Sequence, residues 1–142
     1  MIELVPLFKA TFNVGNAFPI GDGPAGTRLV GEISAATVEG ERIRATLAGT
    51  AAADWMVRTG SIAVVDVRLT LRTDDGALIY MTYGGRLDLA SPPGELFAYV
   101  APTFETGDER YAWLNRIQAV GKGLLTTAPE GGRLDYEFFE VR

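Results

Sequence analysis

The sequence contains no cysteine and no histidine among its 142 residues. A thiolate nucleophile, a thiolate or imidazole metal site, and a Ser-His-Asp triad are therefore excluded within this chain. Carboxylate-only Mg²⁺ or Ca²⁺ binding stays open, but the acidic clusters Asp74-Asp75-Gly76 and Glu137 with Glu140 lack the spacing of a calcium loop. We expect no metal and no other cofactor.

Positive charge is also scarce, with 13 Lys and Arg against 18 Asp and Glu and a net charge of −5. Binding to a phosphate backbone needs clustered basic residues, so no nucleic-acid partner is expected. Apolar runs of the roughly 18–20 residues that span a bilayer are missing, so no membrane partner is expected either. Met1-Ile2-Glu3-Leu4 does not resemble the basic start of a signal peptide, and we expect a cytoplasmic protein.

Glycine, by contrast, is abundant at 17 residues, and helical periodicity is weak. Strand-like runs alternate with turn residues such as Glu39-Gly40 and Ser91-Pro92-Pro93-Gly94. No linker divides the chain, so we expect one domain, residues 1–142. The predicted strands cover residues 2–14, 27–38, 41–49, 60–72, 77–86, 95–101, 114–127 and 132–142.

These features predict an all-β fold in which successive strands pair as antiparallel hairpins. Closure into a barrel would remove the exposed sheet edges, and an eight-stranded barrel either fills with side chains or holds one small ligand. At most one short helix is expected, around 107–114, where Asp108 can cap a turn.

The hairpin across Glu39-Gly40 suggests which side chains line the interior. With a two-residue loop, Ile43 and its alternate neighbours face inward, and the opposing strand places Glu32 on the same face. A buried carboxylate needs a partner, and Arg28 has the matching parity. A different loop length would reverse this assignment.

The hairpin across Asp75-Gly76 is harder to interpret. A two-residue loop places Val67 on one face with Tyr80, and puts Arg68 on the opposite face with Met81 and Tyr83. Periodicity favours solvent for the second face, yet a mixture of Arg, Asp, Tyr and Met also suits a cavity wall.

Several short motifs recur along the chain in a characteristic order. They are Gly26-Thr27-Arg28, Val38-Glu39-Gly40, Ala53-Asp54-Trp55, Asp66-Val67-Arg68, Thr73 to Tyr80, Gly85, Phe104-Glu105-Thr106, Tyr111 to Arg116 and Gly121-Lys122-Gly123. Together they resemble DUF3237, also called UPF0311, a bacterial and fungal family without a generally assigned activity. The resemblance implies an antiparallel, up-and-down, lipocalin-like β-barrel of about eight strands.

The chain departs from the family pattern at a few positions. Ala35-Ala36 stands where Gly-Gly is common, Gly40-Glu41 where Gly-Pro is common, and Ala52 where a Gly usually precedes Ala-Asp-Trp. These changes concern local turn geometry rather than the fold.

The resemblance and the residue chemistry together single out Asp54 and Trp55. An Asp near an apolar indole can have a raised pKa and act as an acid or base. Alternatively, Asp54 caps a turn and Trp55 plugs one end of the barrel.

Arg68 is the second catalytic candidate, because its planar guanidinium can hold an oxyanion or a carboxylate. An ion pair with Asp66 or Glu32 is the alternative. Tyr83 can donate a hydrogen bond to a ligand. Further candidates for ligand binding are Arg28, Glu32, Trp55 and Asp66.

The longest irregular connection carries four further candidates for ligand binding: Phe104, Tyr111, Trp113 and Asn115. Such a connection often forms a lid or a pocket rim. Alternatively, Trp113 and Phe104 are core residues or plug one end of the barrel, and Asn115 ties the segment to the sheet.

Two classes of function remain. The first is a small-molecule-binding barrel, with an anionic or phenolic organic metabolite as one candidate ligand. The second is a cofactor-independent isomerase, hydratase, lyase or cyclase that uses Asp54 as acid or base and Arg68 with a Tyr as oxyanion stabiliser. A homo-oligomer is expected, because barrels with an open seam or apolar outer face bury it by self-association.

Overall fold

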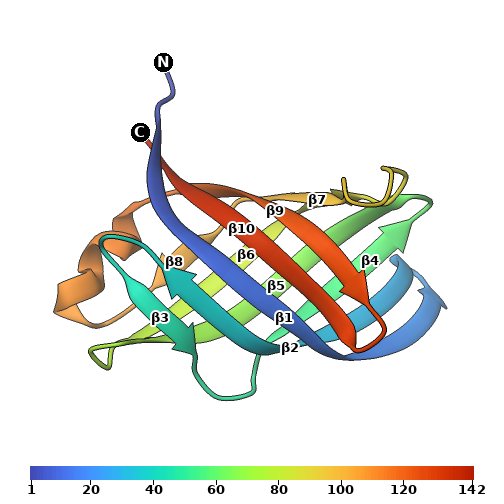
Figure 1. Cartoon of the computed structure of the whole chain (residues 1–142), viewed down its shortest axis with the longest axis horizontal. Coiled ribbons are helices and arrows are strands. Elements are labelled where there is room, and N and C mark those ends of the chain that lie inside the picture. The colour runs from blue at the N-terminus through green and yellow to red at the C-terminus, as the bar shows by residue number, and fades with distance from the viewer.

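The computed structural model describes residues 1–142 as a barrel of antiparallel strands with one short 3₁₀ helix (Figure 1). The predicted all-β fold class is confirmed. Its elements are β1 (Leu4–Gly23), β2 (Gly26–Glu39), β3 (Arg44–Leu47), β4 (Ala53–Thr59), β5 (Ile62–Thr73), β6 (Leu78–Asp88), β7 (Phe97–Val100), β8 (Thr103–Glu105), η1 (Glu109–Arg116), β9 (Ala119–Ala128) and β10 (Gly131–Val141).

The ten strands occupy eight positions around the barrel. β3 and β4 both pair with β2 and β5, so they are two segments of one interrupted position. β7 and β8 both pair with β6 and form a second interrupted position. Because neighbouring positions follow one another in the chain, the topology is up-and-down.

Pairing between the first and last strands closes the barrel. β1 and β10 run antiparallel from the Leu4 and Val141 pair to Asn13 and Arg133. Just beyond, Glu3 and Arg142 exchange two backbone hydrogen bonds of 2.8 and 2.9 Å. An open seam is therefore no reason for self-association, and the expected homo-oligomer stays a prediction.

One end of the barrel is filled by side chains. Leu114 of η1 is fully buried, and the Phe8 and Phe104 rings meet edge to face with centroids 6.0 Å apart. Asp108 caps η1 by accepting a hydrogen bond from the backbone N–H of Arg110, as the sequence predicted. β3, β8 and η1 lie at this end (Figure 1), and the cavity lies in the other half of the barrel.

The β5–β6 hairpin corrects the predicted face assignment. Thr73 and Ala77 are paired through their backbones, which leaves a three-residue loop with Gly76 at φ 94°. A three-residue loop with a left-handed Gly shifts the register by one residue relative to a two-residue loop. Met81 and Tyr83 consequently share the inner face with Val67, and Tyr80 points outward.

A bulge in β2 corrects the second assignment. Asn13 pairs with Ala35 but Val14 pairs with Ile33, so Ser34 is an extra residue in the ladder. The bulge reverses the inward parity along β2. Val38 faces inward, but Glu32 does not, contrary to the prediction, because Ile33 takes the inner face in this half of the strand.

No helix of this structure combines the length and the apolar character that a membrane crossing requires.

Candidate functional site

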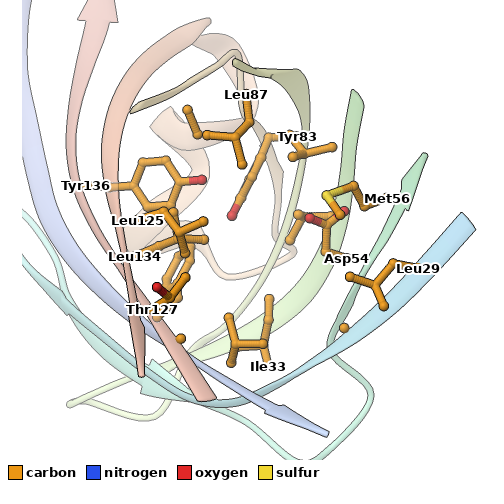
Figure 2. A pocket seen from close by; sticks show the side chains of 17 residues that line it. Leu29, Ile33, Asp54, Met56, Tyr83, Leu87, Leu125, Thr127, Leu134 and Tyr136 are labelled. Atoms are coloured by element: carbon orange, nitrogen blue, oxygen red, sulfur yellow. The ribbon is translucent and has the colours of Figure 1, made fainter. Parts of the chain in front are cut away.

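The open half of the barrel contains a cavity of about 250 Å³. Its walls are mostly apolar, and the polar side chains in them are Asp54, Tyr83, Thr127 and Tyr136. The remaining lining residues are Phe12, Val14, Leu29, Gly31, Ile33, Met56, Val65, Val67, Leu87, Ala98, Leu125, Gly132 and Leu134. Figure 2 shows Asp54, Tyr83 and Tyr136 directed into this space from different sides.

Asp54 lies in β4, a strand that falls between the predicted strands 41–49 and 60–72. Asp54 pairs with Val67 of β5, and alternation along the strand directs its carboxylate inward while Trp55 points outward. The carboxylate oxygen Oδ1 accepts a hydrogen bond of 2.9 Å from the backbone N–H of Asp66. Asp54 therefore belongs to the cavity wall, and its predicted alternative role as a turn cap is wrong.

The ladder between β4 and β5 is interrupted beside Asp54. Regular pairing stops after Asp54 and resumes at Val57, so Trp55 and Met56 have no ladder partner on β5. The Asp54 carboxylate takes the N–H of Asp66, and Arg28 Nη1 donates to the Trp55 carbonyl at 2.6 Å. Two side chains thus satisfy backbone groups that a continuous ladder would have paired.

The surroundings of Asp54 raise its pKa to about 6. Desolvation by the apolar walls is the largest cause, and the nearby negative charge of Asp66 adds to it. The hydrogen bond from the Asp66 backbone acts in the opposite direction by stabilising the carboxylate. Near neutral pH, Asp54 is consequently poised to exchange a proton.

Tyr83 and Tyr136 bring two phenol groups to the same cavity. Tyr83 extends from β6 and Tyr136 from β10, and their rings meet edge to face with centroids 5.7 Å apart. The Tyr83 hydroxyl is buried and makes no hydrogen bond of good geometry, although the Tyr136 hydroxyl is near enough to influence its pKa. Burial raises the pKa of both phenols above the usual value, so both are neutral hydrogen-bond donors near neutral pH.

Two glycines on β9 make room for the aromatic wall. Gly123 pairs with Tyr136 and Gly121 with Phe138, and these two rings are stacked with centroids 4.8 Å apart. A Cβ atom on either glycine would come within 2.5 Å of the facing ring. The Gly121-Lys122-Gly123 motif is thereby explained by the rings that cover it.

Arg68, a predicted catalytic residue, lies outside the barrel. Its guanidinium carbon is 4.1 Å from the centre of the Trp55 ring, which is also on the outer face. Strand alternation places Arg68 opposite in parity to Val67, which does line the cavity. The expectation that Arg68 stabilises an oxyanion in the cavity is wrong, because the cavity wall contains no Arg or Lys.

Three more predicted ligand-binding residues are on this outer face. Arg28 bonds to the Trp55 carbonyl and makes no ion pair with Glu32. Asp66 is exposed, and it affects the site through its backbone N–H and through its negative charge, not as part of the cavity wall. The β2 bulge accounts for the position of Arg28 and Glu32, and none of these side chains lines the cavity.

The predicted lid residues lie at the opposite, packed end of the barrel. The Tyr111 hydroxyl donates a hydrogen bond of 2.8 Å to Oδ1 of Asp75. The guanidinium carbon of Arg42 lies 3.5 Å from the centre of the Trp113 ring. Asn115 bonds to the backbone of Thr106 through both its amide oxygen and nitrogen. With Phe104 in the core, these four residues close the base, as the alternative interpretation stated, and do not contact the cavity.

Sequence reasoning placed Asp54 and Tyr83 among the site residues but missed Tyr136. The signal for Tyr136 was present in the facing patterns Gly-Lys-Gly and Tyr-Glu-Phe, because alternate glycines opposite alternate aromatics indicate rings lying across a sheet. The aliphatic lining residues gave no such signal, since they read as ordinary core positions.

Comparison with known proteins identifies relatives over nearly the whole chain. The family described as "Protein of unknown function (DUF3237)" matches residues 2–141. A UPF0311 protein of Rhodopseudomonas palustris is 26% identical over 132 residues, which cover 84% of this chain and 86% of the relative. The hydroalkoxylation enzyme phnH of Penicillium herquei is 29% identical over 115 residues, which cover 81% of this chain and 70% of that enzyme.

Solved structures show the same fold. A β-barrel-like protein from Acinetobacter baumannii has a TM-score of 0.85 and 25% identity, covering 100% of this chain and 97% of the other. An enzyme from Penicillium herquei has a TM-score of 0.69 and 26% identity, covering 99% and 94%. The fold is thus found in an enzyme as well as in proteins without a stated activity.

Proposed function

The chain belongs to the DUF3237 family, and we propose that it binds a small, largely apolar organic molecule inside its barrel and transfers a proton on it through Asp54. The observation that carries this proposal is a carboxylate of pKa about 6 in a mostly apolar wall. A general acid or base is most effective when its pKa is close to the working pH.

The cavity supplies the binding half of this function. Its volume of about 250 Å³ lies just below the roughly 300–1,000 Å³ of pockets for drug-sized ligands, so the ligand is small. Apolar walls favour an apolar ligand through the release of water from both surfaces. Asp54 is held at this wall by the backbone of Asp66, so its position does not depend on the ligand.

The proposed proton transfer follows from the arrangement of Asp54 with the two tyrosines. As a base, the carboxylate can remove a proton from a bound molecule, and a phenol O–H can stabilise negative charge that develops on an oxygen. No metal or redox group is needed for such a step. The hydroalkoxylation enzyme phnH among the relatives supports a reaction of this class, because adding O–H to an alkene moves a proton.

A general proton-transfer probe tests the proposal without knowledge of the natural substrate. 5-Nitrobenzisoxazole is neutral and flat. When a base removes its ring C–H proton, the C–H electron pair completes a nitrile and the N–O bond breaks to give a coloured phenolate. We expect the protein to accelerate this reaction with a rate that rises with pH around a midpoint of about 6.

The decisive variant is Asp54→Asn, which keeps the shape and removes the titrating proton. The rate should fall by roughly 10²–10⁴-fold, whereas Asp74→Asn, a change at an exposed loop carboxylate, should leave it unchanged. Equal rates for Asp54→Asn and the wild type would refute proton transfer by Asp54. If the wild type binds the probe without accelerating the reaction, the chain is a binding protein only.

A further inference from the structure

The Tyr83 hydroxyl carries an inference about the kind of molecule that enters the cavity. A phenol O–H in a buried position almost always finds a hydrogen-bond partner, because burying it unpaired is costly. Here it is buried and directed into the cavity close to Asp54 and Tyr136, and neither of these side chains forms a hydrogen bond of good geometry with it (Figure 2). A bound molecule is the partner that would satisfy it.

The charges around the cavity restrict the molecule further. No Lys or Arg is present in the wall, and the guanidinium groups of Arg28 and Arg68 contact Trp55 on the outer face. An anion would lose its hydration without gaining a cation, and it would face the Asp54 carboxylate. A cation would have Asp54 as a partner but would leave the Tyr83 donor without an acceptor.

We propose that the ligand is electrically neutral and presents a hydrogen-bond-accepting oxygen, such as a carbonyl or ether oxygen, to the Tyr83 hydroxyl. This inference rests on the proposed function, because it assigns the ligand class of the same cavity. In this arrangement the Asp54 carboxylate exchanges the proton, and the Tyr83 hydroxyl binds and orients the oxygen of the ligand.

Four probes of similar size separate the alternatives: acetophenone (neutral, with a carbonyl), ethylbenzene (neutral, without an acceptor), benzoate (anionic) and benzylammonium (cationic). Binding is measured by NMR titration of the protein at pH 7.5. We expect acetophenone to bind best. Loss of one hydrogen bond should weaken ethylbenzene by about 3- to 10-fold relative to acetophenone.

Tyr83→Phe is the test variant, because it removes only the hydroxyl. It should make acetophenone and ethylbenzene bind equally, while Tyr111→Phe, which loses a hydroxyl at the packed end, should keep the preference. Stronger binding of benzoate or benzylammonium, an unchanged preference in Tyr83→Phe, or no binding of any probe at millimolar concentration would overturn the inference.

These outcomes are distinguishable from failure of the proposed function. The titrations measure equilibrium binding and do not need turnover. If Asp54→Asn retains the proton-transfer rate but Tyr83→Phe loses the carbonyl preference, the catalytic role fails and the ligand class stands. The opposite pair of results refutes the ligand class alone.

Discussion

The carboxylate of Asp54 accepts a hydrogen bond from the backbone N–H of Asp66 at 2.9 Å, across an interruption in the β4–β5 ladder. A side chain thereby does what a strand carbonyl does elsewhere in the barrel. This arrangement fixes a charged group at an apolar cavity and ties the structure of the wall to the protonation state of the site.

Asp54→Asn should change how stability depends on pH. The folded-state pKa of about 6 exceeds the unfolded value of 3.8, so the folded protein holds the proton more tightly. Ionisation of Asp54 therefore lowers the stability of the wild-type protein. This destabilisation is absent below pH 4, grows between pH 4 and 6, and is complete above pH 6. Urea unfolding should show that the variant gains about 1–3 kcal/mol relative to the wild type between pH 4 and pH 7.5. A constant difference across this range would contradict the raised pKa.

Arg28→Met should weaken the wall beside Asp54. The change removes the donor to the Trp55 carbonyl and leaves that group without a partner, so the free energy of unfolding should fall by about 1–3 kcal/mol. Amide hydrogen exchange in β4 should accelerate locally. Arg58→Met, at an exposed position of the same strand, is the matched control and should change neither quantity. Equal exchange rates in the two variants would show that Arg28 does not stabilise β4 at the interruption in the β4–β5 ladder.

Tyr83→Phe should stabilise the ligand-free protein. The buried hydroxyl makes no hydrogen bond of good geometry, so its removal saves a desolvation cost of about 1 kcal/mol while the ring is retained. Urea unfolding should therefore show a higher free energy of unfolding. Tyr80→Phe, an exposed tyrosine of the same strand, should have no effect. A loss of stability in Tyr83→Phe would indicate that the hydroxyl has a partner in the protein.

Gly123→Ala should disturb the cavity through Tyr136. The added Cβ would lie 2.5 Å from the ring of Tyr136, so the ring must move and the stability should fall by about 1–3 kcal/mol. Binding of acetophenone should weaken in the same variant. Gly107→Ala, where the added atom meets nothing within 4 Å, serves as the control. Normal binding with normal stability in Gly123→Ala would contradict the described packing.

Arg68→Met should leave acetophenone binding and the proton-transfer rate unchanged, because the guanidinium stacks on Trp55 outside the barrel. Loss of the cation–π contact should lower stability by about 0.5–1 kcal/mol. A loss of binding in a folded variant, measured by the same NMR titration, would show that Arg68 contributes to ligand binding after all.

The fold was predictable because its evidence is local and repeated. Alternating side chains, turn residues at hairpin spacing and the absence of helical periodicity all indicate antiparallel strands. The predicted number of about eight agrees with the eight positions of the barrel, although two positions contain two segments each. Motif order along the chain supplied the family, and the match over residues 2–141 confirms it.

The cavity was less predictable, since inside and outside depend on single residues. One extra residue at Ser34 moved Arg28 and Glu32 to the outer face, and one extra residue in the loop ending at Gly76 brought Tyr83 inward. Strand alternation has a period of two, so each such shift reverses every later side chain. Alternative turn types and bulges differ little in energy, so their positions are difficult to infer from the pattern of a single sequence.

The two interrupted positions divide the barrel into levels. β3 and β8 lie at the packed end with η1, whereas β4 and β7 border the cavity. Both breaks, at residues 48–52 and 101–102, fall between these levels. A change in the length of β4 or β7 can therefore be absorbed at its break, whereas the other six positions run through both levels without interruption. Variation confined to these two strands can thus reshape the cavity wall while the packed base keeps its structure.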